Sequence, residues 1–329
     1  MRRRDCLAAL AFSAAVSRAN AATFPERPII LSNGYPPGGS TDVAARLIMD
    51  GMMRAMPNSR VIVENRPGAS GTIACDWLRR QTADGYSLLL SESSSFAIWP
   101  SMHAEGTRYD PLADFDWVST VCTAPLVFIV SPDFPAKTVE EAIDVLRSPK
   151  SEKLDYSSSG AGSIPHIAAE MLRKVVGDTN QSRHVSYRGG APAVLSVSKG
   201  ETGWGVASLG SAAGLLQGGG LRALAVTGAK RFPSFPDVPT FTERGLPEME
   251  VEIYYLVHAP ARLPGGIHET LSAAVASALQ DETVRSRFIA AGMEAWTGPN
   301  TATTTRAIVT AELKRFKDIS ARTGIRISA

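Results

Sequence analysis

The sequence contains few of the side chains that bind metals or form disulfides. Its 329 residues include three cysteines and five histidines, and the histidines are scattered rather than spaced as zinc ligands are. We therefore expect no metal site and no cofactor. Cys75 and Cys122 lie far apart in apolar contexts, which leaves a disulfide between them open.

Long hydrophobic runs are also absent. Beyond the N-terminus no stretch approaches the ~20 apolar residues of a membrane-spanning helix, although 44% of the residues are hydrophobic. This content and a mean hydropathy near zero predict an ordinary buried core. The length predicts roughly two domains of about 150 residues each.

The N-terminus differs from the rest of the chain. Arg2 to Arg4 precede an apolar run, Cys6 to Val16, and an Ala19-Asn20-Ala21 site follows. This pattern predicts that residues 1–22 are a secretory signal peptide, and the paired arginines leave twin-arginine export open. Without residues 1–22 the formal charge of +2 becomes −1, so the basic pI gives no reason to expect nucleic-acid binding.

The motifs of common enzyme classes are missing. There is no G-x-S-x-G nucleophile elbow, no phosphate-binding G-x-x-x-x-G-K-[ST] loop, and no G-x-G-x-x-G after a strand with a downstream acidic partner. Ser40 and Ser163 stand at predicted helix starts, but the spacing gives neither a histidine partner. We therefore expect that the protein is not an enzyme. A serine hydrolase is the remote alternative.

One loop is the strongest local feature. Pro36-Pro37-Gly38-Gly39-Ser40-Thr41-Asp42 separates an apolar strand, 28–31, from an amphipathic helix that begins near Val43. The prolines and glycines predict a sharp turn, and Ser40, Thr41 or Asp42 can cap the helix. Such a loop aims unpaired backbone N–H groups at one point and can hold an anion, although an ordinary capped turn is an equal alternative.

The same unit of strand, small-residue turn and helix recurs. Ser158 to Ser163 precede a predicted helix, as do Arg188 to Pro192, and Ser93 to Ser95 follow a third predicted strand, 86–90. Thr138 and Glu141 form a predicted capping box, and helices are predicted at 72–81, 267–280 and 300–323. Alternating strands and helices predict an α/β fold with a parallel sheet, in which loops at strand ends surround a ligand crevice.

Several stretches together resemble the Bug family, the periplasmic solute receptors of tripartite tricarboxylate transporters. They occur in the family's order over about residues 24–325: Phe24 to Ile29, Pro36 to Asp42, Val63 to Ala69, Asp84 to Tyr86, Tyr156 to Gly160, Tyr187 to Ala193, Leu221 to Thr227 and Phe235 to Thr240.

The resemblance implies a two-lobed type II periplasmic-binding-protein fold that closes like a Venus flytrap. Each lobe would be a mixed or parallel sheet flanked by helices. Lobe 1 would hold residues 23–124 and 247–329, and lobe 2 residues 125–246. Two crossing segments, near 122–125 and 243–251, would form the hinge.

The resemblance also implies where a ligand binds. In this family backbone amides, hydroxyls and ordered water hold a ligand carboxylate. Matched position by position, the expected ligand-binding residues are Pro37, Gly38, Gly39, Ser40, Thr41, Ser93, Ser94 and Ser95 from lobe 1, and Ser159, Gly160, Ala161, Gly162, Ser163, His166, Gly189, Gly190, Ala191 and Ser208 from lobe 2.

The chain departs from the family pattern after the third helix of lobe 2. Where many relatives carry an acidic residue and an Asp-Asn pair, this chain has Gly203 and Ala207-Ser208. The departure puts amino-dicarboxylates in doubt and favours a smaller or less polar ligand.

Several side chains have an ordinary structural alternative. His166 either touches the ligand or is a half-exposed helix histidine, and Arg188 either attracts anions or is merely solvated. Asp42 is expected to cap its helix, and Trp99 and Phe96 to pack in the core. Of Tyr254 and Tyr255, alternation along a strand allows only one to face the cleft.

The function expected from the resemblance is capture of a small organic carboxylate in the periplasm and its delivery to a transporter. The partners would be separate integral-membrane subunits, and the receptor itself would be a monomer. A sensor that uses the same fold for signalling is the alternative.

Overall fold

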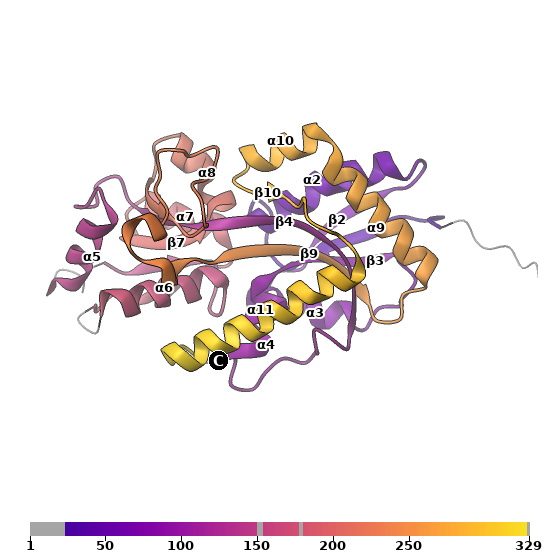
Figure 1. The fold of residues 1–329 in the computed structure, drawn as a ribbon, viewed down its shortest axis with the longest axis horizontal. Coiled ribbons are helices and arrows are strands. Elements are labelled where there is room, and N and C mark those ends of the chain that lie inside the picture. Colours follow the sequence, from indigo (N-terminus) through magenta and orange to yellow (C-terminus); the bar gives the residue numbers. More distant parts are fainter. Residues whose placement is uncertain (1–23, 150–153, 178–179, 328–329) are drawn as a thin grey trace, which may run out of the picture.

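The computed structural model describes residues 24–149, 154–177 and 180–327 (Figure 1). This part of the chain forms a mixed sheet with strand order β2-β1-β3-β9-β4-β7-β5-β6, and β8 and β10 pair with β4 off this path. Helices cover both faces of the sheet (Figure 1). The predicted signal peptide, residues 1–22, lies outside the described residues.

The elements have the following bounds. The strands are β1 (Ile29–Asn33), β2 (Val61–Asn65), β3 (Ser87–Glu92), β4 (Phe115–Val130), β5 (Tyr156–Ser158), β6 (His184–Ser186), β7 (Trp204–Ser208), β8 (Arg222–Val226), β9 (Glu252–Pro260) and β10 (Glu294–Ala295). The helices are α2 (Ser40–Ala55), α3 (Thr72–Leu78), α4 (Trp99–Met102), α5 (Val139–Arg147), α6 (Ile164–Val176), α7 (Gly190–Ser198), α8 (Leu209–Gln217), α9 (Gly265–Gln280), α10 (Glu282–Ala290) and α11 (Ala302–Thr323).

The N-terminal strands pair as the sequence predicts. β1 pairs in parallel with β2 on one side and with β3 on the other, and α2 and α3 lie between them in the chain. α2 packs on α9 at Gly51, where an added Cβ atom would lie 2.3 Å from the Cβ of Ala278. The absence of a side chain at Gly51 therefore lets these two helices touch.

A single long strand joins two halves of the sheet. Residues 115–125 of β4 pair with β9, which in turn pairs with β3, and these strands with β1, β2 and β10 form the first half-sheet. Residues 126–130 pair instead with β7 and β8 and, with β5 and β6, form the second half-sheet. The predicted strand 126–130 is thus only the second part of a 16-residue strand.

The helices divide in the same way. α5, α6, α7 and α8 lie around the second half-sheet, on the left of Figure 1, and α2, α9, α10 and α11 lie by the first. The chain returns to the first half-sheet at Val251, whose N–H donates to the carbonyl of Thr227 (3.1 Å). The Thr227 hydroxyl accepts the N–H of Leu126 (2.8 Å), so the two crossing segments are hydrogen-bonded side by side.

Two predicted elements need correction, and β6, β7, α8 and α10 were not predicted. Ser93 to Ser95 do not form an open loop, because a short helical turn, Ser94–Ile98, begins directly after β3 and continues into α4. α3 ends at Leu78 rather than 81. The weakly amphipathic sequence of α10 explains why it was not predicted: only Val284 and Phe288 are buried.

Within the described residues, Cys75 and Cys122 are both buried and unpaired, so the disulfide that the sequence left open is not formed. No described helix has the length and apolar composition that crossing a membrane requires. No group of three metal-binding side chains comes together among these residues either.

The N-terminus of α5 provides a test of the capping interpretation. The Thr138 hydroxyl accepts the N–H of Glu141 (3.2 Å), while the Glu141 carboxylate accepts the N–H of Lys137 (2.7 Å) rather than that of Thr138. We expect Thr138→Ala to lower the free energy of unfolding by about 1 kcal/mol, because an N-terminal N–H loses its partner. Urea unfolding of both proteins measures this loss, and Thr138→Ser, which keeps the hydroxyl, should retain most of the stability.

Candidate functional site

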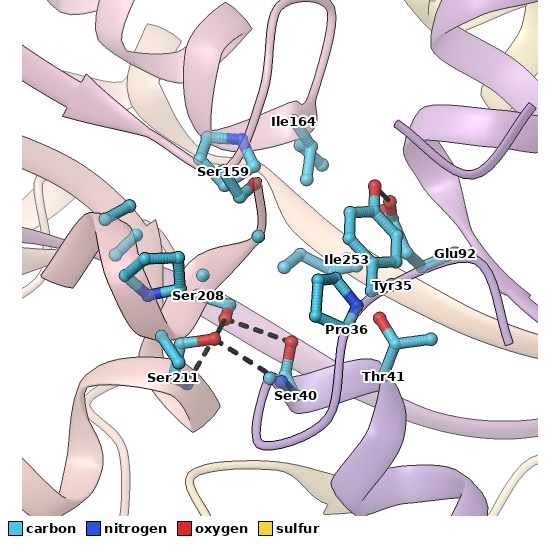
Figure 2. Close-up of a pocket in the computed structure, with 18 of the residues that line it drawn as sticks. Tyr35, Pro36, Ser40, Thr41, Glu92, Ser159, Ile164, Ser208, Ser211 and Ile253 are labelled. Carbon is cyan, nitrogen blue, oxygen red and sulfur yellow. Dashed lines mark hydrogen bonds between the residues drawn. The ribbon is translucent and has the colours of Figure 1, made fainter. Parts of the chain in front are cut away.

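A narrow cavity lies where the two half-sheets meet. It is bounded by the N-terminal turns of α2 and α7, the start of α8, and side chains of β3, β7 and β9 (Figure 2). It leaves only about 30 Å³ to the centres of water molecules, which is room for roughly two of them.

The N-termini of four helices contribute to this cavity. The lining residues at these ends are Gly39, Ser40 and Thr41 of α2, Ile164 and Pro165 of α6, Gly189, Gly190 and Ala191 of α7, and Ser208 and Ser211 of α8. First-turn N–H groups have no acceptor inside their own helix, and the helix dipole is positive at this end. The cavity therefore has the local potential that favours a carboxylate.

Hydroxyl groups form a cluster on one side of the cavity. The Tyr255 hydroxyl donates to Ser40 Oγ (2.9 Å). Ser208 Oγ lies 3.1 Å from Ser40 Oγ and 2.8 Å from Ser211 Oγ (Figure 2). Burial raises the pKa of Tyr255 well above its ordinary value, so this phenol stays protonated and remains a donor. The cluster joins α2 to α8 and offers donors and acceptors to a ligand.

Two charged side chains are present among the described residues of the cavity lining. Glu92, at the end of β3, is 4% exposed and accepts hydrogen bonds from the Tyr35 hydroxyl and the N–H of Ser94 (2.9 Å). Burial raises the pKa of its carboxyl group. Arg188 is exposed and lines both the cavity and a second hollow.

This second hollow, which we call the outer hollow, adjoins the cavity. It includes Ser70, Trp99, Gly160, Ala161 and Tyr187, and it shares five residues with the cavity: Tyr35, Pro36, Ser159, Arg188 and Gly189. The shared residues make the two spaces contiguous, and Arg188 lines both of them.

The structure brings many of the expected binding residues together. Those that line the cavity are Pro37, Gly39, Ser40, Thr41, Ser159, Gly189, Gly190, Ala191 and Ser208. Gly160 and Ala161 line the outer hollow instead. The Gly-Ser turns from both half-sheets thus face a shared space, and Tyr255 rather than Tyr254 is the tyrosine that lines it.

Seven expected residues line neither space: Gly38, Ser93, Ser94, Ser95, Gly162, Ser163 and His166. Ser93 and Ser95 are buried, and Ser95 Oγ donates to the carbonyl of Glu92 (3.1 Å), because the helical turn directs both side chains inward. The Gly38 N–H donates to Asp42 (3.1 Å), which also pairs with Arg46. Asp42 therefore holds the loop together, but the expected cap is wrong: the N-cap residue of α2 is Gly39, which makes no side-chain capping hydrogen bond.

His166 and Ser163 organise the start of α6 instead of facing the cavity. Ser163 Oγ accepts the N–H of His166 (3.3 Å), and His166 Nδ1 accepts the N–H of Gly162 (3.1 Å). The His166 ring also stacks on His184, with ring centres 4.0 Å apart. These contacts support the structural role of His166 as a helix histidine rather than contact with a ligand.

Contacts across the cavity hold the two half-sheets close. The N–H of Ile164 donates to Ser94 Oγ (2.8 Å), and Ser70 Oγ donates to the carbonyl of Ala161 (2.8 Å). Gly189 approaches Pro36 so closely that an added Cβ would lie 3.1 Å from its Cδ. Ser94 thus acts at this interface rather than in the cavity wall.

Sequence reasoning missed several wall residues, among them Tyr35, Glu92, Ser211 and Ile253. Ser211 was detectable, because it follows Ser208 at capping spacing and its N–H donates to Ser208 Oγ (3.3 Å). Glu92 was visible as the acidic residue in a serine-rich strand end. Gly203, in contrast, lies away from the cavity, where an added Cβ would meet Leu154.

The chain was compared with known proteins. A family model described as "Tripartite tricarboxylate transporter family receptor" matches residues 44–325. Protein BugT of Bordetella pertussis is 31% identical, and the match covers 94% of this chain and 93% of BugT.

Two solved structures with bound acids are also similar. Rpa4515 of R. palustris, determined with adipate, is 28% identical with a TM-score of 0.86, and the match covers 92% of this chain and 99% of that one. MatC of Rhodopseudomonas palustris, determined with malate, is 26% identical with a TM-score of 0.84 and covers 90% and 99%. A periplasmic binding protein named BugD has the same fold, with a TM-score of 0.87.

Proposed function

Because this chain belongs to the tripartite tricarboxylate transporter receptors, a family of periplasmic solute-binding proteins, we propose that it captures a small organic carboxylate in the cavity between α2, α7 and α8. The receptor then delivers this acid to separate integral-membrane subunits of a transporter. In this proposal the protein acts in the periplasm, as a monomer, and binds its ligand without reacting with it.

The convergence of four helix N-termini on one small space is the observation that carries the proposal. Hydrogen bonds to a charged group contribute about 1.5–3 kcal/mol each, so a few such bonds offset the cost of closing the protein around a ligand. The malate and adipate in the two similar structures support the same ligand class.

We propose that the expected lobes, residues 23–124 with 247–329 and residues 125–246, separate to admit the ligand. The small cavity volume supports this, because about 30 Å³ leaves little room for an organic acid. The change of partners within β4 and the hydrogen bonds between Thr227, Leu126 and Val251 support a hinge at the two crossing segments.

The surroundings of the candidate nucleophiles favour a binder over a hydrolase. The Ser40 hydroxyl is bonded to Tyr255 and Ser208, and the Ser163 hydroxyl accepts a backbone N–H. In the described part of the chain, neither hydroxyl contacts an imidazole that could act as a general base.

Calorimetric titration of the mature protein with mono- and dicarboxylates of two to six carbons tests the proposal. We expect at least one acid to bind with a dissociation constant around micromolar, about −8 kcal/mol. The amide of the same acid is the control and should not bind, because it carries no charge for the helix N-termini. Equal binding of acid and amide, or turnover of ester analogues, would contradict the proposal.

A further inference from the structure

Glu92 is an unexpected group in a cavity that favours anions. Its carboxyl group forms part of the wall, is 4% exposed, and lies beside Tyr35 (Figure 2). A second negative charge near a ligand carboxylate is repulsive, and a buried carboxylate is costly unless its oxygens are hydrogen-bonded. The placement therefore calls for a compensating group.

The protein supplies only part of that compensation. Each carboxylate oxygen can accept about two hydrogen bonds. One oxygen of Glu92 accepts the Tyr35 hydroxyl and the other accepts the N–H of Ser94 (2.9 Å). The Ser94 hydroxyl is a third donor to this carboxylate, so about one acceptor position remains for a donor from the cavity.

We propose that Glu92 is a specificity-determining residue that accepts a hydrogen bond from a hydroxyl or ammonium group of the ligand. The receptor then prefers carboxylic acids that carry such a donor over unsubstituted acids of the same length. This inference rests on the proposed function and names the ligand class of the same cavity.

The inference revises the expectation drawn from Gly203 and Ala207-Ser208, which put amino-dicarboxylates in doubt. Gly203 lies outside the cavity lining, whereas Ala207 and Ser208 are part of it and carry no charge. Glu92 provides an acidic group from β3 instead. An ammonium group beside it forms a charge-assisted bond, which is stronger than the bond from a neutral hydroxyl.

A structural role for Glu92, holding Tyr35 and the start of the helical turn, is the competing explanation. Glu92→Gln separates the two roles because glutamine has the same shape. Its amide oxygen can accept the Ser94 N–H, and its NH₂ group can donate to the Tyr35 oxygen. The variant should therefore keep the wall intact while it loses the charge.

The experiment is calorimetric titration of wild type and Glu92→Gln at pH 7 with two series of acids: succinate, malate and aspartate, and propionate, lactate and alanine. We expect wild type to bind a donor-bearing member at least about tenfold tighter than the unsubstituted member of its series. In Glu92→Gln this ratio should fall at least about fivefold, and more for the ammonium than for the hydroxyl compound.

Glu170→Gln is the matched control. Glu170 on α6 also accepts a hydrogen bond from a buried tyrosine, Tyr156, but it does not line the cavity. This variant should keep the wild-type ratio, and the melting temperature of each variant reports any structural damage. An equal change of the ratio in both variants would show a general effect and overturn the inference.

The outcomes distinguish failure of the proposed function from failure of the role proposed for Glu92. If wild type binds succinate or propionate as tightly as the substituted acids, or if Glu92→Gln leaves the ratio unchanged, the proposed function stands and the role of Glu92 falls. If neither series binds wild type, this inference falls, and the proposed function falls with it only if the remaining acids of two to six carbons also fail to bind.

Discussion

Replacing Ala191 with tryptophan is expected to abolish ligand binding while the protein remains folded. Ala191 lines the cavity from the first turn of α7, and the space in front of it holds only about two water molecules. An indole ring there occupies the position of the ligand and obstructs closure. We expect the affinity for the best-binding carboxylate to fall at least about 100-fold, that is by about 2.8 kcal/mol, in calorimetric titration.

A tryptophan introduced elsewhere controls for general effects of the large side chain. Ala321 is exposed near the end of α11, away from the cavity. Ala321→Trp should bind like wild type, and both variants should melt within a few degrees of wild type, because Ala191 is only half-buried. If Ala191→Trp retained wild-type affinity, this cavity would not be the ligand site.

The parts of the site that could be predicted from the sequence are those fixed by local chain geometry. Pro37 to Thr41 and Gly189 to Ala191 each combine a turn with the start of a helix, and each follows a parallel strand, β1 in the first half-sheet and β6 in the second. Within each half-sheet such turns gather at the edge where the parallel strands end. Because β4 runs through both half-sheets antiparallel to β9 and β7, β1 and β6 run in opposite directions and their carboxyl ends face each other. The structure accordingly brings them to one cavity.

The parts that could not be predicted depend on contacts between distant residues. Ser93 to Ser95 have the composition of a loop, but the buried turn after β3 forms because α11 and β9 cover it: Ser93 Oγ accepts the N–H of Tyr254 (3.0 Å) and lies 3.5 Å from Glu312. Glu92 reaches the cavity by the same tertiary packing. The length of β4 is likewise set by its partners. Two different sets of strands form hydrogen bonds with its backbone along its length.

His258 should make the protein less stable in mild acid, and replacing it should reduce that loss. Its ring is fully buried on β9 and stacks on Trp117 at 4.5 Å, and neither ring nitrogen has a hydrogen-bond partner among the described residues. Burial lowers the pKa of His258 to about 3, whereas an unfolded histidine titrates near 6.5. The unfolded chain therefore takes up the proton first.

The sign and size of the change in unfolding free energy follow from the difference between the pKa values of His258 in the folded and unfolded states. Stability is fully present above pH 6.5 and is lost as the pH falls from 6.5 toward 3, because only the unfolded state binds the proton in that range. At pH 5 the loss is about 2 kcal/mol relative to pH 8. We expect His258→Phe, which keeps an aromatic ring against Trp117, to show a drop in unfolding free energy that is smaller by about this amount.

Urea unfolding at pH 8 and pH 5 measures the difference between the two proteins. Burial also lowers the pKa of His184 to about 4 and raises that of Glu312 to about 7, but both groups are present in wild type and variant and cancel in the comparison. His103→Phe is the matched control, because His103 also stacks on a tryptophan, Trp99, at 4.5 Å but is only half-buried. If the unfolding free energy depends on pH equally in wild type and His258→Phe, the buried imidazole finds a proton acceptor or opens to water in the folded protein. A smaller pH dependence of the unfolding free energy in His258→Phe alone would assign the acid sensitivity to burial at this one position.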